Sequence, residues 1–376
     1  LHGTKHSFPT RRSSDLVISD NIDTDEDEPE FWWSSTMHGD ETTGIILTLR
    51  FADYLLTNYG SIPQVTNLVD NVEIYINPMS NPDGTFNNSP TGTSISSAIR
   101  YNSNNVDLNR NFPRMDGGSV NNQQEIQIMM DYTTAHDFVM SVNIHGGAEV
   151  ANYPWDTYTS AQNTHSDDTW WDYVAHVYAD NVISISGGDS FTDTYSNGVT
   201  EGGDWYVITG SRQDYMNYFQ GVREITMEVS TDKDLEVEYL NTYWNYNRQA
   251  MLDYTEQVLY GFRGIVTDAC TGVPLTDVKV EIVGHDEDNS EVYTSAPVGN
   301  YHRPIYEGTW SVTFSKTGYQ SQTHSVTVTN DNSTRLDIEL IPTGVAVPDF
   351  EASSVNVIIG SDIDFTDLTS GTVTSM

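Results

Sequence analysis

The stretch that decides the fold is FWWSSTMHGDETTGIILTLRFADYLLTNYG, residues 31–60. It opens with the apolar run FWWSS, which predicts a short buried strand that ends in a polar turn. From TTG onward the apolar residues recur at helical spacing up to Gly60, which predicts a helix stopped by a glycine. A strand, a polar loop and a helix in this order are typical of α/β proteins.

The same pattern returns further along the chain. Strands that run into polar turns are predicted for NVEIYINPMSNPDG (71–84), FVMSVNIHGG (138–147) and REITMEVS (223–230). YLNTYWNYNRQAMLDYTEQVLYG (239–261) predicts a closing helix that Gly261 ends. Ligands of open α/β sheets bind outside the carboxyl ends of the strands, so we expect the functional site there.

Composition and charge limit the classes of function. The chain has 376 residues, which favours two or more domains, and 37% hydrophobic and 11% aromatic residues supply packed cores. A formal charge of -38, from 54 acidic and 16 basic residues, repels phosphate backbones and anionic lipids and attracts cationic peptides. No apolar run is long enough to span a membrane. We therefore expect neither nucleic acid nor a membrane span, and the sequence does not predict the oligomeric state.

The chain divides into four segments. Residues 1–16, LHGTKHSFPTRRSSDL, resemble a translated sequencing adaptor and are interpreted as a non-native leader that lacks the apolar core of a signal peptide. Residues 17–260 form the predicted α/β domain, shortened at its N-terminus. Alternation with period two then predicts an all-β sandwich over 261–342. Residues 343–376 hold a Pro/Gly linker and the beginning of another β-domain.

Two histidines and an acidic residue stand where strands are predicted to end. His38 and Glu41 lie in the turn after the first strand, and His145 ends the strand FVMSVNIH. Imidazole nitrogens and a carboxylate oxygen suit zinc, and a catalytic zinc keeps three protein ligands and one open position. Each residue taken alone is better explained as part of a polar turn or as a satisfied histidine at a strand end.

Other polar residues could act beside such a metal. Glu228 stands among alternating apolar residues, where a carboxylate lies on a solvated face or in a polar site, and metal-assisted hydrolysis needs a carboxylate to carry the proton. RYNSNNVDLNRNFP (100–113) places Arg100 and Arg110 near Asn109, and a guanidinium binds a carboxylate in bidentate fashion. The stretch suits recognition of a free C-terminus, although alone it is better explained as a solvated loop.

Together these motifs resemble the zinc carboxypeptidases of the funnelin family, in particular the regulatory branch that includes carboxypeptidases N, E and D. The resemblance spans about residues 30–261 and rests on HGDE with NPDG, VDLNRNFP, IHGGAEVANYPWD, and DWYVITGSRQDYMNYF leading to EITMEVS. It implies an α/β fold with a mixed central β-sheet flanked by helices.

The resemblance also implies the catalytic residues. One zinc ion per chain would be held by His38, Glu41 and His145. Glu228 would act as general base and then as general acid. Arg100 would stabilise the oxyanion of the tetrahedral intermediate.

Five further residues would bind the substrate. Asn109 and Arg110 match the pair that binds the terminal carboxylate, and Tyr206 matches the mobile tyrosine that closes over the substrate. Asp156 falls where the regulatory branch has an acidic residue in the pocket for the leaving side chain, with Gln213 at the pocket floor. This favours C-terminal Arg or Lys.

The expected function is that of a metallocarboxypeptidase, a hydrolase that cleaves the C-terminal peptide bond of peptides or proteins with water activated by zinc and Glu228. One alternative is a zinc-dependent deacylase of N-acyl amino acids on the same fold. A non-catalytic cell-surface binding protein is another alternative.

The C-terminal segments carry resemblances of their own. Residues 262–341 resemble the transthyretin-like module of the same branch, and His285 and His302 within it are expected at the surface. Residues 346–376 resemble the start of a PKD-like surface domain. Together they imply a secreted or cell-surface bacterial protein whose signal peptide is not present in this chain.

Overall fold

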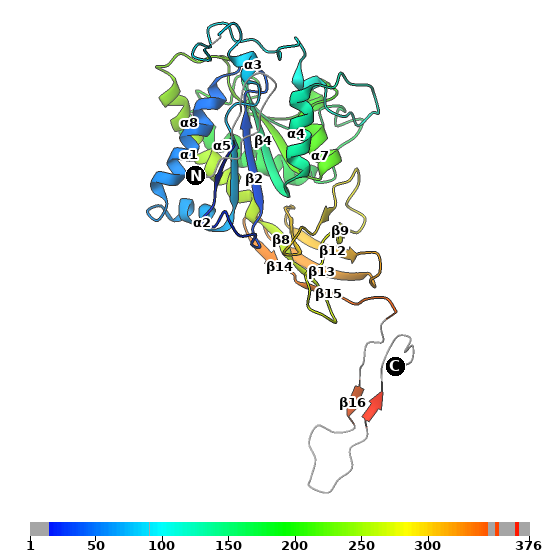
Figure 1. Cartoon of the computed structure of the whole chain (residues 1–376). Coiled ribbons are helices and arrows are strands. Elements are labelled where there is room, and N and C mark those ends of the chain that lie inside the picture. The colour runs from blue at the N-terminus through cyan, green and yellow to red at the C-terminus, as the bar shows by residue number, and fades with distance from the viewer. Residues whose placement is uncertain (1–14, 90, 345–349, 353–364, 368–376) are drawn as a thin grey trace.

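The computed structural model describes residues 15–89, 91–344, 350–352 and 365–367. Its larger part is an α/β domain built on one seven-stranded sheet, and a β-sandwich lies beneath it (Figure 1). The expected non-native leader therefore falls almost wholly outside the described residues.

The sheet of the α/β domain is mixed. Its strand order is β1-β3-β2-β4-β7-β5-β6; β3, β2, β4 and β7 are parallel, whereas β1 and β5 run antiparallel to β3 and β7. Because β2, β4 and β7 are parallel neighbours, their carboxyl ends lie at the same edge. The strands are Leu16–Ile18 (β1), Glu30–Ser35 (β2), Glu73–Asn77 (β3), Phe138–His145 (β4), Ala148–Tyr153 (β5), Val199–Glu201 (β6) and Arg223–Ser230 (β7).

Helices cover both faces of this sheet. α1, α2, α5 and α8 lie on one side, and α4 and α7 lie on the other (Figure 1). Phe31 and Trp33 pack into the first core and Trp32 into the second, so β2 is buried on both faces and its sequence is a continuous apolar run. The helices are Thr43–Asn58 (α1), Pro63–Asn71 (α2), Pro82–Thr85 (α3), Gln124–Thr134 (α4), Asp168–Ser186 (α5), Gly202–Trp205 (α6), Arg212–Gln220 (α7) and Leu240–Glu256 (α8).

The predicted strand, loop and helix of residues 31–60 are confirmed by β2 and α1. The prediction that Gly261 ends the closing helix is wrong. α8 ends at Glu256, a short 3-10 turn follows, and Gly261, with φ +102°, begins β8. A Cβ at this position would lie 2.3 Å from the carbonyl oxygen of Arg303, so close backbone approach inside the sandwich explains the glycine.

The predicted all-β segment is confirmed as two facing sheets. One has the order β10-β9-β12-β13, and the other has β11-β8-β14 with β15 also paired to β8. Its strands are Gly261–Asp268 (β8), Lys279–Ile282 (β9), Val292–Tyr293 (β10), Asn300–Arg303 (β11), Gly308–Ser315 (β12), Gln322–Val328 (β13), Ser333–Arg335 (β14) and Ile338–Leu340 (β15). Beyond it, Phe350–Ala352 (β16) and Phe365–Asp367 (β17) pair antiparallel.

The sandwich packs on the α/β domain through charged side chains. His302 is 6% exposed, so the prediction that it lies at the surface is wrong. The side chain of His285 is 19% exposed and contacts Asp167. The alternating pattern of a strand shows which residues share a face, but not whether another domain covers that face. Among the described helices, none has the length and apolar character needed to cross a membrane.

Candidate active site and metal centre

The loop between β2 and α1 carries two of the predicted metal ligands, His38 and Glu41. Thr36 opens this loop with a left-handed backbone, φ 61°, which a β-branched residue adopts only at a cost. Gly39 packs so closely on Gly84 that a Cβ would lie 2.4 Å from the carbonyl carbon of Gly84. The HGDE turn therefore requires glycine and is held against the NPDG turn.

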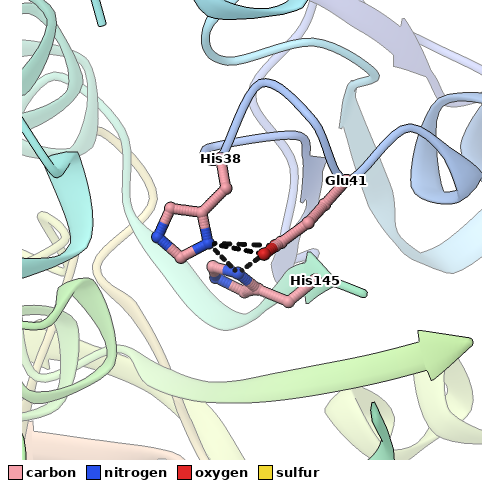
Figure 2. A group of neighbouring side chains, drawn as sticks. All are labelled: His38, Glu41 and His145. Carbon is pink, nitrogen blue, oxygen red and sulfur yellow. Dashed lines mark hydrogen bonds and ion pairs between the residues drawn. The ribbon is translucent and has the colours of Figure 1, made fainter. Parts of the chain in front are cut away.

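The third predicted ligand, His145, is the last residue of β4 and reaches the same point (Figure 2). Its Nδ1 lies 3.0 Å from Nδ1 of His38 and 2.8 Å from Oε2 of Glu41. Nδ1 of His38 lies 3.0 Å from each oxygen of Glu41. The structure thus brings the three buried side chains together from two neighbouring strand ends.

This donor set fits zinc. Zinc binds imidazole nitrogen and carboxylate oxygen at about 2.0–2.2 Å in a tetrahedral array, so ligand atoms around one ion stand roughly 3.3 Å apart. The separations here, from 2.8 to 3.0 Å, are close to that value. Three protein ligands leave one coordination position open, as catalytic zinc sites require.

Asp107 orients the first imidazole, and sequence reasoning did not single it out. Its Oδ1 lies 3.1 Å from Nε2 of His38, and its Oδ2 accepts a hydrogen bond from Nε of Arg100 at 2.9 Å. A proton on Nε2 leaves Nδ1 of His38 free to bind a metal. Nη1 of Arg100 lies 3.1 Å from that Nδ1 and 3.4 Å from Oε1 of Glu41. The only signal in the sequence was an aspartate inside VDLNRNFP.

The charges of two of the three donors, Glu41 and His145, match what a cation needs. Burial alone would raise the pKa of Glu41, but the adjacent His38 and His145 hold that pKa well below its usual range. Burial lowers the pKa of His145 to about 4. An ionised carboxylate and a neutral imidazole are the states that bind metal ions.

Glu228 lies beside the donors on the neighbouring strand. β7 pairs with β4 so that Glu228 is the register partner of His145. Its Oε2 is shielded from solvent and has no hydrogen-bond partner among the described residues. Burial, and after it the charge of Glu41, raise the pKa of Glu228 well above its ordinary value. A carboxyl group with a raised pKa holds a proton more tightly than an ordinary glutamate does, and proton-carrying carboxyl groups of active sites often have such raised pKa values.

The predicted substrate-binding residues Asn109, Arg110 and Tyr206 have accessible polar groups. Oδ1 of Asn109 accepts a hydrogen bond from the backbone N–H of Arg212 at 2.9 Å, which leaves the amide Nδ2 for another partner. Arg110 donates from Nη1 to the carbonyl oxygen of Asn109 and forms no ion pair within the described part of the chain. Tyr206 follows α6 and is 47% exposed.

Asp156 and Gln213 contact each other among buried polar side chains. Nε2 of Gln213 donates to Oδ1 of Asp156 at 3.1 Å, while its Oε1 accepts from the backbone N–H of Thr226 at 2.7 Å. Burial, and then the charge of Asp214, raise the pKa of Asp156 to about 8. A Cβ on Gly202 would lie 2.0 Å from Oδ1 of Asp156, so the carboxylate needs a glycine beside it. Gln213 thus links the carboxyl group of Asp156 to the backbone of β7.

Family models match nearly the whole chain. Residues 4–250 match the model described as zinc carboxypeptidase, and residues 261–341 match the carboxypeptidase regulatory-like domain. Among solved structures, thrombin-activatable fibrinolysis inhibitor is similar with a TM-score of 0.57 at 17% identity, covering 68% of this chain and 69% of that chain. Carboxypeptidase A from Helicoverpa armigera gives a TM-score of 0.52 at 17% identity, with 67% of each chain covered. These two structures support the fold.

Curated relatives agree with the family models. Carboxypeptidase D from Mus musculus is 35% identical over 91% of this chain, which spans only 25% of that protein. Carboxypeptidase M from Mus musculus is 34% identical, with 80% of this chain and 69% of that protein covered. The catalytic chain of carboxypeptidase N from the same organism is 31% identical, with 83% and 74% covered. The chain therefore belongs to the zinc carboxypeptidase family, in the regulatory branch of carboxypeptidases D, M and N.

Proposed function

We propose that this protein is a zinc-dependent metallocarboxypeptidase that hydrolyses the C-terminal peptide bond of peptides or proteins and prefers C-terminal Arg or Lys. One observation carries the proposal. His38, Glu41 and His145 converge at the carboxyl ends of β2 and β4 (Figure 2). Glu228 stands on the adjacent strand.

The chemistry divides between the metal and the side chains. Bound zinc would supply a Lewis acid that polarises the peptide carbonyl and acidifies water. Glu228 takes the proton from the attacking water and passes it to the leaving amine. Arg100 lies next to His38 and Glu41 and offers positive charge where negative charge develops on the carbonyl oxygen.

Arg110 and Asn109 suit the free carboxylate of the substrate. With 54 acidic and 16 basic residues, the protein offers its arginines many carboxylates, yet Arg110 pairs with none among the described residues. An unpaired guanidinium next to a free amide can bind a carboxylate through several hydrogen bonds. Recognition of this group would restrict cleavage to the last residue.

Asp156 supports the preference for basic side chains. A buried carboxylate without a cationic partner carries a desolvation cost, which a guanidinium or ammonium group of the substrate would offset. A neutral side chain would leave the carboxyl group unpaired. The pocket should therefore discriminate by charge more than by size.

Hydrolysis of blocked dipeptides ending in Arg, Lys, Phe or Glu, with and without a chelator, tests the function. We expect the Arg and Lys substrates to be cleaved fastest, the chelator to abolish cleavage, and added zinc to restore it. Cleavage that resists the chelator would contradict a metalloenzyme. An N-acyl aspartate in the same series separates the peptidase from a deacylase, which would prefer it to every dipeptide.

Asp156→Ala tests the specificity pocket. We expect kcat/KM to fall by about 10²-fold on the Arg and Lys substrates, because an unpaired charge costs roughly 3 kcal/mol, and to change little on Phe. Asp204→Ala is the matched control, because it removes an exposed carboxylate from the neighbouring helix α6. An equal loss on Phe would show that Asp156 is structural.

Export from the cell is also part of the proposal. It rests on the resemblance of residues 346–376 to a PKD-like surface domain and on the transthyretin-like assignment of the sandwich. Most of the PKD-like segment lies outside the described residues. Fractionation of the native producing cells tests the proposal, since an exported enzyme would be found in the medium or at the cell surface.

A further inference from the structure

A lysine beside the metal centre has no part in the chemistry proposed above. Lys233 lies in the loop after β7, and its Nζ is 3.1 Å from Oε1 of Glu41 and 3.3 Å from Oδ2 of Asp40. The Glu41 side chain is 3% exposed and the Lys233 side chain is 39% exposed, so a partly solvated cation contacts a buried carboxylate. Exposed ion pairs contribute little to stability, but this one acts on a buried group.

The lysine also contacts both segments that carry the metal-binding side chains. Its carbonyl oxygen accepts a hydrogen bond at 2.8 Å from the backbone N–H of Thr42, the residue after Glu41. Its side chain passes over Gly147, just beyond His145, where a Cβ would lie 3.4 Å from Cε of the lysine. Lys233 is therefore placed to affect the geometry of the donors from one side.

The two oxygens of Glu41 share His38, whose Nδ1 lies 3.0 Å from each, but otherwise have different partners. Oε2 lies 2.8 Å from Nδ1 of His145 and accepts a hydrogen bond from the backbone N–H of Gly146 at 3.3 Å. Oε1 faces Nζ of Lys233 at 3.1 Å and Nη1 of Arg100 at 3.4 Å. Within the described residues, the lysine and the arginine thus contact one oxygen and leave the other to His145.

We infer that Lys233 is a positioning residue of the metal centre, which holds Oε1 of Glu41 and thereby turns Oε2 toward His145. The inference rests on the proposed function, because it concerns how the chain prepares its zinc ligands. Groups that orient metal ligands typically change metal affinity about 10–100-fold when they are removed. A compact ammonium suits this place because it reaches two neighbouring carboxylates at once.

Lys233→Met tests the inference, because it removes the charge and keeps most of the side-chain length. We expect the zinc dissociation constant, measured by competition with a chromophoric chelator, to rise about 10–100-fold. The visible spectrum of the cobalt-substituted protein should also change, because Glu41 is no longer held in one orientation. Lys233→Arg keeps the cation and should recover most of the affinity.

Lys279→Met is the matched control. Lys279 lies in the sandwich, its side chain is 31% exposed, and it also contacts two carboxylates, Glu281 and Glu291. Zinc affinity should not change in this variant, although the net charge changes equally.

Unchanged zinc affinity in Lys233→Met, or an equal loss in Lys279→Met, would overturn the positioning role and leave the proposed enzyme intact. A wild-type protein that binds no zinc would overturn the proposed function and the inference with it. Circular dichroism of each metal-free variant checks folding. Lys233→Gln is the second charge-removing variant in case Lys233→Met does not fold.

Discussion

Two buried aspartates of the α/β domain have opposite electrostatic surroundings. Asp156 in the proposed specificity pocket is 2% exposed, and Asp167, just before α5, is 1% exposed. Burial and the charge of Asp214 raise the pKa of Asp156 to about 8. Burial acts on Asp167 too, but Arg303 and Arg223 hold its pKa well below its ordinary value. The difference therefore lies in the partners and not in the depth of burial.

The cluster around Asp167 satisfies its own charges. Each oxygen of Asp167 accepts a hydrogen bond at 2.8 Å from Arg303 of the sandwich, and Arg223 of β7 adds another at 3.0 Å. Nε2 of His285 lies 2.8 Å from Oδ1 of Asp167, and Arg303 also donates to Asp286 at 2.6 Å. Asp167, His285 and Asp286 are near enough to hold a metal ion, but Arg303 already supplies the cation. This cluster joins the two domains.

Histidines and carboxylates in close proximity thus occur both in the metal centre and in the Asp167 cluster and do not by themselves identify a ligand site. The Asp167 cluster contains its own cations, whereas Asp156 and Glu228 have no arginine or lysine paired with them in the described structure. Strand β7 reaches both places. Arg223 at its start belongs to the Asp167 cluster that joins the two domains, which we call the joint, and Glu228 near its end lies beside the metal donors. A substitution at the site should consequently lower activity and spare stability, whereas one in the Asp167 cluster should lower stability and spare activity.

Glu228→Gln should give the largest effect. Glutamine cannot accept the proton, so we expect kcat to fall by roughly 10²–10⁴-fold while zinc stays bound. The substitution also removes a buried carboxyl group whose Oε2 has no partner among the described residues, so the free energy of unfolding should stay equal or rise. Zinc content, kcat on an Arg substrate and urea unfolding measure the three quantities. Retained turnover would remove Glu228 from the mechanism.

Arg303→Met tests the Asp167 cluster, which lies at the other end of β7, although Arg303 itself belongs to β11 of the sandwich. It leaves the carboxylate of Asp167 buried without its bidentate partner, and the free energy of unfolding should fall by about 3–5 kcal/mol. In the zinc-loaded folded fraction kcat should not change, because Arg303 contacts the joint and not the site. Urea unfolding followed by tryptophan fluorescence measures the loss.

The matched control for that experiment is Arg335→Met. Arg335 also lies in the sandwich and pairs with Asp27 and Asp337, but its side chain is 45% exposed. The expected loss is therefore only about 0–1 kcal/mol. An equal decrease in the free energy of unfolding for the two variants would show that the contribution of the Asp167 cluster to stability does not depend on its burial.

Sequence reasoning located the metal centre because its side chains stand at strand ends. His38, Glu41 and His145 each follow an apolar run, and parallel neighbours bring such positions to one edge. The side chains that support them come from other loops. Asp107 and Lys233 reach the centre only through the tertiary approach of segments with no regular spacing from it, so no sequence pattern predicts their contacts.

The contacts between the two domains around Asp167 could not be predicted from the sequence, for a different reason. Alternating residues in the sandwich identify its core face, and His285 and Arg303 do not differ in pattern from solvated residues. The contacts that distinguish them are made with Asp167, a residue of another domain. The same limit applies to Asp156, whose position was inferred from the family resemblance and whose missing countercharge became visible only when its neighbours were known.

The pH dependence of specificity should be the smallest effect, and it tests Asp156 in the intact enzyme. With its pKa raised to about 8 from 3.8, the carboxyl group of the empty pocket is protonated at neutral pH. A substrate guanidinium favours the ionised form, so binding releases a proton below pH 8 and KM for an Arg substrate should fall as the pH rises toward 8, by at most about tenfold per pH unit. The ratio of KM for Arg to KM for Phe cancels changes common to both substrates. Asp156→Asn should flatten this ratio, whereas a flat ratio in the wild-type enzyme would mean that Asp156 is already ionised and that the two aspartates do not differ as argued.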